Sequence, residues 1–338
     1  MKTLHPNNVA ILPNAYDVDD LLWQYAKWQH IKQRTLGKEK SKKKRRRRKK
    51  YQDKRNWRET NERLIKRGEF YINPSFLEAW KEELKDMNTG KVGNPYLYPN
   101  SMIEFLAILH EKNFDYRALQ GIIRALSKRL GNFPVIYYSQ ICRRVNALDI
   151  NFGQNLENNL IVGIDGSGNK VSNRGEWMRH KWKVRRGWIK VVIMGTLDGR
   201  IVDVRVGNET LDERKAGRGM LRKNKKKIKK AIFDGLHDCE DTFNLCDELG
   251  IEPVIKIRKN ASEKGFSRRA KEVRLYKEIG HKQWVKKKGY GLRWPSSEGI
   301  FSGAKRIFGE CVTATKKRNM YRQAKRKFWA YNKLLEVT

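Results

Sequence analysis

The stretch NLIVGIDGSG, residues 159–168, decides the fold. It is an apolar run that ends in Asp-Gly at Asp165, which is typical of a strand buried on both faces of a sheet. A second such run, KAIFDG at 230–235, ends in Asp-Gly at Asp234. Between them, the segment WIKVVIMGTLDGRIVDVRVG at 188–207 indicates a hairpin of two strands joined at Leu-Asp-Gly-Arg. Together these segments predict a mixed sheet in an α/β fold.

The spacing of apolar residues predicts the elements that surround this sheet. We expect helices at about 211–228, 239–250, 267–280, 297–310 and 315–336, and a further strand at 252–258. The resulting order, three strands and then alternating helices and strands, indicates a layered fold with helices flanking the sheet. We therefore expect residues 151–314 to form this domain and residues 315–338 to be a basic C-terminal helix.

Residues 57–150 have a purely helical pattern. The segment SFLEAWKEELKDMN begins at Ser75, whose hydroxyl we expect to cap a helix. Three further helical segments with short connections are typical of a helix-turn-helix DNA-binding region. The last of them would be the recognition helix, with three candidate groove contacts: Gln140, Arg143 and Arg144. The solvent-exposed face of a helix that only packs against its neighbours would carry the same residues.

The chain is strongly basic, with 75 Lys and Arg against 37 Asp and Glu and a formal net charge of +38. Eleven basic residues lie in the run KEKSKKKRRRRKK at 38–50 alone. Like charges at this density resist packing, so we expect 1–56 to be a partly flexible arm that binds DNA phosphates without reading sequence. Nucleic acid is the expected partner, and an anionic membrane surface is the rival.

Other features restrict the class of protein. The sequence shows no apolar stretch long enough to cross a bilayer and no N-terminal secretion signal. Its four cysteines are scattered and its six histidines lack metal-binding spacing, which speaks against a disulfide framework or a zinc ribbon. We expect a soluble intracellular protein, cytoplasmic and associated with the nucleoid, with no membrane partner.

Two acids stand out because they lie in apolar settings in so basic a chain. Asp165 and Asp234 each end an expected strand, and sites in open α/β sheets lie at the carboxyl ends of strands. If the two strands are neighbours, the carboxylates converge and need cations between them. Mg²⁺ or Mn²⁺ prefers such oxygen ligands, and a pair of these ions is suited to phosphoryl transfer.

Glu298 is the expected third acid. Helical spacing places it on one face with Ser302 and Lys305. The opposite face holds residues suited to packing on a sheet: Ile300, Ala304, Ile307 and Cys311. A surface ion pair on an ordinary amphipathic helix would show the same spacing.

The order strand-Asp, strand-Asp, helix-Glu resembles the ribonuclease-H-like catalytic core of DDE transposases from prokaryotic insertion sequences. Many of these carry Tyr, two residues, Arg, three residues, Glu, six residues and Lys. Here Tyr290, Arg293, Glu298 and Lys305 follow that pattern, except that the gap between Arg and Glu is one residue longer. The resemblance implies a ribonuclease-H-like mixed sheet with flanking helices, preceded by the helix-turn-helix-type region.

The resemblance also implies an activity. Such enzymes bind the terminal inverted repeats of their element, cut the DNA by metal-assisted hydrolysis and join the freed 3′-hydroxyl to target DNA. Asp165, Asp234 and Glu298 would be the catalytic residues and would hold two Mg²⁺ or Mn²⁺ ions. Three further residues would contact the DNA near the cut: Tyr290, Arg293 and Lys305. Joining two element ends implies a homodimer in the complex with double-stranded DNA.

The segment around Asp234 resembles the family's Asp-Gly-x-Tyr-Asp stretch, with His237 in place of Tyr, so no role carries over to His237. Asp238 lies one turn after Asp234. We expect Asp234 to bind metal and Asp238 to cap the next helix, accepting from a backbone N–H at or just before Asp241. Asp238→Asn should then have only a mild effect.

Residues 167–187 interleave seven Lys or Arg with Trp177 and Trp182. This pattern is typical of a surface that follows a nucleic-acid backbone and stacks an unpaired base, although each Trp could instead anchor the loop to the core. Two alternatives stay open for the whole chain. One is a structure-specific nuclease or resolvase on the same fold, and the other is a non-catalytic DNA-binding protein derived from a transposase.

Overall fold

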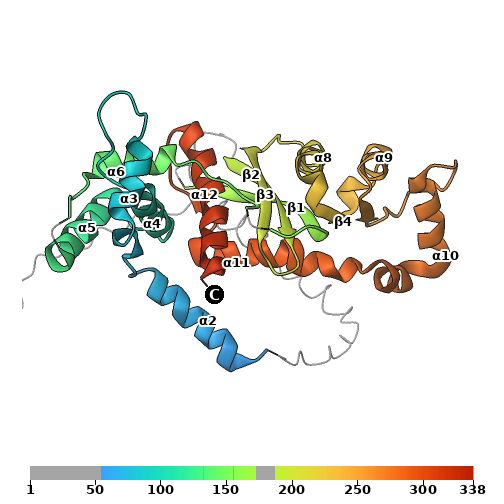
Figure 1. Ribbon diagram of the computed structural model, residues 1–338. Helices are drawn as coiled ribbons and strands as arrows, with labels where there is room; N and C mark the ends of the chain where they lie inside the picture. The colour runs from blue at the N-terminus through green and yellow to red at the C-terminus, as the bar shows by residue number, and fades with distance from the viewer. Residues whose placement is uncertain (1–54, 132, 155, 173–186, 338) are drawn as a thin grey trace, which may run out of the picture. The chain divides into compact units, whose positions relative to one another are not determined.

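The computed structural model describes residues 55–131, 133–154, 156–172 and 187–337 (Figure 1). The basic run at 38–50 and the tryptophans Trp177 and Trp182 lie outside these ranges. The chain divides into two units, Met1–Asn56 and Trp57–Thr338, and the elements described below belong to the second.

The described strands form one mixed sheet with the order β3-β2-β1-β4-β5, and β6 pairs with the end of β1. They are β1 (Leu160–Val171), β2 (Trp188–Thr196), β3 (Ile201–Asn208), β4 (Ile228–Phe233), β5 (Glu252–Ile255) and β6 (Cys311–Val312). β1, β2 and β3 are antiparallel neighbours, whereas β4 runs parallel to both β1 and β5. The predicted sheet and the hairpin at 188–207 are confirmed.

Asp165 lies in the middle of β1, so the prediction that it ends the strand was wrong. Parallel pairing with β4 stops at Ile164, opposite Phe233. β1 nevertheless continues to Val171 because its pairing with β2 begins at Val162 and extends past Asp165, opposite Ile193, to Lys170. Asp165 is therefore the first residue beyond the parallel pairing.

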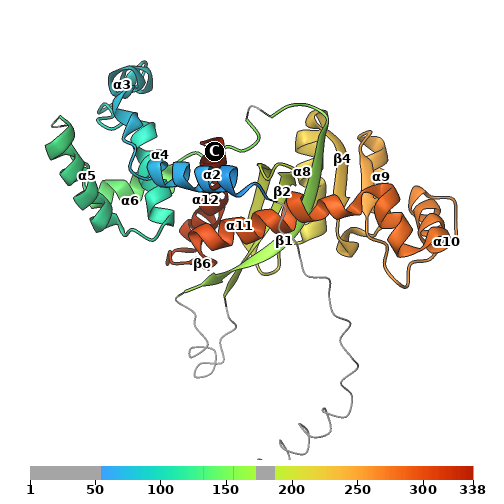
Figure 2. The same ribbon diagram turned by 90° about the horizontal axis from the view of Figure 1, so that it is seen from below.

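Helices cover both faces of the sheet (Figures 1 and 2). They are α8 (Glu213–Asn224), α9 (Glu240–Glu248), α10 (Arg268–Lys288), α11 (Gly299–Phe308) and α12 (Lys317–Glu336). β2 alternates between the faces, as a strand buried on both sides does. Val192 and Met194 join the cluster built with α8 and α9, and Val191 and Ile193 join the cluster built with α11 and α12. The flanking helices are thus confirmed.

α10 and α11 are both shaped by glycines with positive φ. α10 contains a kink at Gly280, where φ is 74°. α11 ends at Phe308, and Gly309, where φ is 71°, turns the chain out of the helix. Cys311, which we expected on the buried face of this helix, is therefore exposed at the start of β6.

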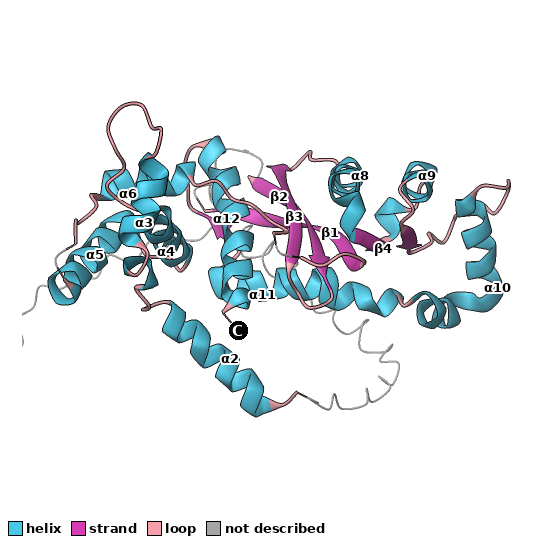
Figure 3. Cartoon of the chain, viewed as in Figure 1, coloured by secondary structure: helices cyan, strands magenta, loops and turns pink. Residues whose placement is uncertain are grey.

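The N-terminal part of the second unit is helical, as predicted (Figure 3). Its helices are α2 (Trp57–Phe70), α3 (Trp80–Asn88), α4 (Asn100–Glu111), α5 (Tyr116–Leu130) and α6 (Tyr138–Ala147). α4 contacts α12, where Arg326 Nε donates to Glu111 Oε1 at 2.7 Å. Among the described residues, no helix combines the length and the apolar character needed to cross a membrane.

Ser75 does not cap α3, so that prediction was wrong. Ser75 begins a 3₁₀ turn, Ser75–Leu77, and α3 starts only at Trp80, without a side-chain cap. The turn buries Phe76, whose ring centroid lies 5.4 Å from that of Phe105. Packing of this aromatic ring therefore outweighs the local preference of serine for the start of the helix.

Candidate active site

Asp165 and Asp234 come from neighbouring parallel strands. Because Ile164 pairs with Phe233, the two aspartates are the next residue on each strand. Burial raises the pKa of Asp165 to about 6. The negative charges of Asp234 and Glu213 also raise this pKa, whereas Arg293 and a hydrogen bond from the backbone N–H of Gly166 lower it. Several carboxylates therefore share this edge of the sheet.

Asp234 is held by the turn that follows it. Its Oδ1 accepts a hydrogen bond from the backbone N–H of Leu236 at 3.0 Å, which caps the 3₁₀ turn Gly235–His237. The turn directs the chain from β4 towards α9 and brings His237 back beside Phe233, with 4.7 Å between the ring centroids.

Arg293 links the first and third predicted acids. Its Nη2 donates to Asp165 Oδ2 at 2.9 Å, and its Nη1 pairs with Glu298 Oε1. Glu298 is the more exposed of the two, with a side-chain exposure of 46% against 13% for Asp165. The guanidinium therefore lies between Asp165 and Glu298.

The extra residue between Arg293 and Glu298 is absorbed by a π-helical turn, η5 (Trp294–Glu298). An α-helix brings together side chains four residues apart, whereas a π-helix bonds residues five apart. Arg293 and Glu298 are five apart and still pair. The longer gap therefore keeps the Arg-Glu contact that the shorter family spacing would give in an α-helix.

Two glycines let η5 lie directly on the sheet. Gly163 on β1 and Gly195 on β2 are register partners. A Cβ on Gly163 would come 2.9 Å from Ser296 Cβ, and a Cβ on Gly195 would come 2.6 Å from Ser296 O. Neither strand could carry a side chain here without moving the turn. The approach fixes Glu298 at the sheet edge.

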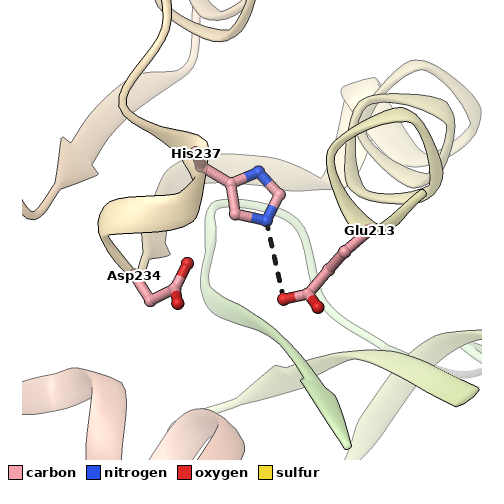
Figure 4. Close-up of side chains that lie close together, drawn as sticks. All are labelled: Glu213, Asp234 and His237. Carbon is pink, nitrogen blue, oxygen red and sulfur yellow. Dashed lines mark ion pairs between the residues drawn. The ribbon is translucent and has the colours of Figure 1, made fainter.

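α8 adds Glu213, a residue that we did not predict. Its side chain is 9% exposed, and Lys190 Nζ lies 3.1 Å from its Oε2. Its Oε1 lies 4.0 Å from His237 Nε2 (Figure 4). Glu213, Asp234 and His237 each place a possible ligand atom within 4.8 Å of the others, so among the described residues they form a group that could hold a metal ion.

Glu213 has little signal in the sequence pattern. Asp212 caps α8 by accepting from the backbone N–H groups of Arg214 and Lys215 at 2.9 and 3.2 Å. An acid directly after such a cap is ordinary in the first turn of a helix. The available signal was the glycine after Asp165, because Gly166 leaves the space that the Glu213 carboxylate fills.

Tyr290 lies close to these acids, whereas Lys305 contacts β1. Burial raises the pKa of Tyr290 to about 12, and Asp234, Asp165 and Glu298 also raise it, whereas Arg293 lowers it. Lys305 Nζ donates to Ser167 Oγ at 2.9 Å and to Gly168 O at 3.0 Å. Burial lowers the pKa of Lys305. Lys305 thus ties α11 to β1.

The candidate DNA contacts on α6, the expected recognition helix, differ in their environments. Gln140 and Arg143 are exposed. Arg144 instead donates to Tyr98 O at 3.1 Å and to Asn100 Oδ1 at 2.8 Å, which holds α6 to the start of α4. Its guanidinium thus has a structural role within the helical region.

Asp238 does not cap α9, so that prediction was wrong. The residue at the cap position is Cys239, which makes no side-chain cap hydrogen bond. Asp238 is buried, and its Oδ1 accepts from Arg269 Nε at 2.6 Å. Its Oδ2 accepts from the backbone N–H of Arg258 at 2.9 Å. The carboxylate turns away from α9 because these two donors satisfy both of its oxygens.

The chain is similar in parts to several solved structures. The Drosophila P element transposase strand transfer complex matches with 16% identity over 52% of this chain and 41% of that one, at a TM-score of 0.27. The piggyBac transposase synaptic complex with hairpin DNA matches with 9% identity over 81% and 75%, at a TM-score of 0.32. A simian T-cell lymphotropic virus intasome matches with 12% identity over 56% and 67%, at a TM-score of 0.22. The chain spans about two fifths of the P element chain that it matches.

None of the curated proteins compared with the sequence matches it significantly. Two family models, both described as a transposase DDE domain, match residues 65–174 and 159–333. The second match covers more than half of the chain and includes Asp165, Asp234 and Glu298. The chain therefore belongs to the transposase DDE domain family.

Proposed function

We propose that this transposase binds the terminal inverted repeats of a mobile DNA element, cleaves the DNA there and joins the freed ends to target DNA. The observation that supports this proposal is the link between three acids from separate parts of the chain, through neighbouring strands and one arginine. Asp165 and Asp234 lie on adjacent strands, and Arg293 holds Glu298 beside Asp165. Family membership supports the same activity.

Asp165, Asp234 and Glu298 would hold Mg²⁺ or Mn²⁺, with two ions per site as phosphoryl transfer favours. Their oxygen donors suit these ions. The burial that raises the pKa of Asp165 to about 6 is a further sign of fit, because a bound cation offsets the cost of a buried negative charge. When bound, such ions supply charge stabilisation at the attacking and leaving oxygens.

The protein's own groups have positioning tasks in this proposal. Arg293 neutralises Asp165 and Glu298, and its guanidinium is a suitable partner for a DNA phosphate that enters the site. Tyr290 is half-buried beside the acids and would orient the DNA end. Lys305 fixes the strand that carries Asp165 through Ser167 and Gly168. These tasks fit a reaction that depends on positioning and charge.

DNA binding would use the positive charge of the chain. A net charge of +38 supports a phosphate-binding surface with strong salt dependence. Gln140 and Arg143 are the exposed candidates on α6. The run at 38–50 and Trp177 and Trp182 remain proposed contacts on sequence grounds. A homodimer is proposed because two element ends must be joined.

The test is metal-dependent cleavage of a labelled DNA that carries the element end. We expect Asp165→Asn, Asp234→Asn and Glu298→Gln each to lower cleavage by about 1,000-fold or more while the affinity for DNA persists. Asp198→Asn is the matched control, because Asp198 is an acid in the β2–β3 turn that pairs with Arg200. Wild-type cleavage by any one of the three variants removes that residue from the site.

A second assay separates the transposase from a nuclease on the same fold. A DNA substrate already cut at the element end is incubated with wild-type protein, metal and a supercoiled target. Joined product is expected. Cleavage in the first assay without joining in the second would favour the nuclease.

A further inference from the structure

His237 has an unusual environment for a buried polar side chain. It is 0% exposed, and neither of its ring nitrogens has a hydrogen-bond partner among the described residues. A buried polar group without a partner costs free energy, so such groups are uncommon and call for an explanation. The ring points its Nε2 towards Glu213, next to Asp234 (Figure 4).

Glu213 faces the same space with one of its two oxygens. Oε2 is paired with Lys190 at 3.1 Å, whereas Oε1 is directed at His237 Nε2. Their separation of 4.0 Å is too long for a hydrogen bond. Two donors bound to opposite sides of one ion, with bonds of about 2.1 Å, lie up to about 4.2 Å apart. The separation therefore leaves room for an ion between two ligands on nearly opposite sides of it.

Glycines make room for both side chains. A Cβ on Gly166, which follows Asp165, would come 2.5 Å from Glu213 Cδ. A Cβ on Gly217, one turn after Glu213 on α8, would come 2.9 Å from His237 Cε1. Small residues thus stand at both points where the group would otherwise be blocked.

We propose that Glu213, Asp234 and His237 bind a divalent transition-metal ion. An imidazole among the ligands favours Mn²⁺, Co²⁺ or Zn²⁺ over Mg²⁺, which prefers oxygen donors alone. The inference deepens the proposed function, on which it rests, because Asp234 belongs to both ligand sets. Glu213 and His237 would make this metal position selective for a different class of ion from one held by carboxylates alone.

The test uses Mn²⁺ and the full chain without DNA. Binding is titrated by electron paramagnetic resonance, and pulsed measurements detect coupling of the bound ion to an imidazole nitrogen. We expect nitrogen coupling in the wild type. His237→Phe should abolish the coupling and weaken binding at this site by about tenfold or more. Glu213→Gln should weaken binding and keep the coupling, and Mg²⁺ should displace the ion only in large excess.

Controls separate loss of a ligand from loss of the fold. Phenylalanine keeps a ring against Phe233, and circular dichroism shows whether the variant is folded. His281→Phe removes an exposed histidine and should leave the coupling unchanged. Absence of nitrogen coupling in the wild type would overturn the proposal. Coupling that persists in folded His237→Phe would overturn it equally.

Further variants distinguish this inference from the proposed function. Asp165→Asn and Glu298→Gln should keep the nitrogen-coupled Mn²⁺ although they lose cleavage. If the wild type shows the coupling but never cleaves DNA, the metal site stands and the proposed function fails. Normal cleavage without any coupling would reject the site and leave the proposed function intact.

Discussion

The turn after β4 contains two aspartates, four residues apart, with opposite environments. Asp238 is buried, and both its oxygens accept hydrogen bonds, from Arg269 and from the backbone of Arg258. Asp234 lies beside His237, whose buried nitrogens have no partner among the described residues. The difference lies in whether the surrounding groups are already satisfied.

Replacement of Asp238, the aspartate with both oxygens hydrogen-bonded, should have a large effect on stability. Asp238→Asn should lower the free energy of unfolding by about 3 kcal/mol, because it removes one partner of a buried ion pair with Arg269. Denaturant unfolding measures this loss. Cleavage by the folded variant should stay at the wild-type level. An unchanged midpoint and slope would show that the pair contributes little.

Two glycines on α8 test the environment that Asp234 shares with His237. Gly217→Ala places a Cβ 2.9 Å from His237 Cε1, so it should displace the ring, lower stability by about 1 kcal/mol and weaken Mn²⁺ binding. Gly219→Ala has nothing within 4 Å of its Cβ and should raise stability by about 0.5–1 kcal/mol through helix propensity. Thermal unfolding with and without Mn²⁺ measures both. Equal effects of the two substitutions would show that His237 is not closely packed against Gly217.

A further expected effect is a dependence of stability on pH in the metal-free protein. Burial raises the pKa of Asp165 to about 6, above its ordinary value of 3.8, so the folded state takes up a proton more readily than the unfolded state. This contribution is present at low pH and is lost as pH rises through about 6. Asp165→Asn should therefore gain stability relative to the wild type between pH 4 and pH 7.

His237 changes the stability in the opposite direction over the same pH range, because burial lowers its pKa from 6.5 to about 4. The stability that His237 contributes is present at neutral pH and is lost as the pH falls from 6.5 towards about 4. The difference between wild type and Asp165→Asn, measured by unfolding at each pH, isolates Asp165 from this effect. A difference that does not change with pH would contradict the assignment to Asp165.

Much of the fold could be predicted because it depends on local patterns. The apolar runs that lead into Asp165 and Asp234 are strands, and the register confirms that they are neighbours. Predictions from local sequence patterns were wrong where tertiary packing determines the conformation. Phe76 overrides Ser75 as a helix start, and Asp238 turns away from α9 towards Arg269.

The site was harder to predict than the fold. Glu213 resembles an ordinary first-turn acid, and its burial depends on Gly166, which belongs to another strand. The pairing of Arg293 with Glu298 depends on a π-helical turn that residue spacing does not reveal. Both features arise from contacts between distant segments, which helical and strand periodicity cannot report.

The most direct test compares Asp234→Asn with Asp238→Asn in one cleavage assay, with metal and element-end DNA, at a temperature where both variants are folded. We predict that Asp234→Asn keeps nearly the wild-type free energy of unfolding and loses cleavage. We predict that Asp238→Asn is less stable and cleaves as the wild type does. Wild-type cleavage by Asp234→Asn, or its loss in folded Asp238→Asn, would contradict the assignment of the two aspartates.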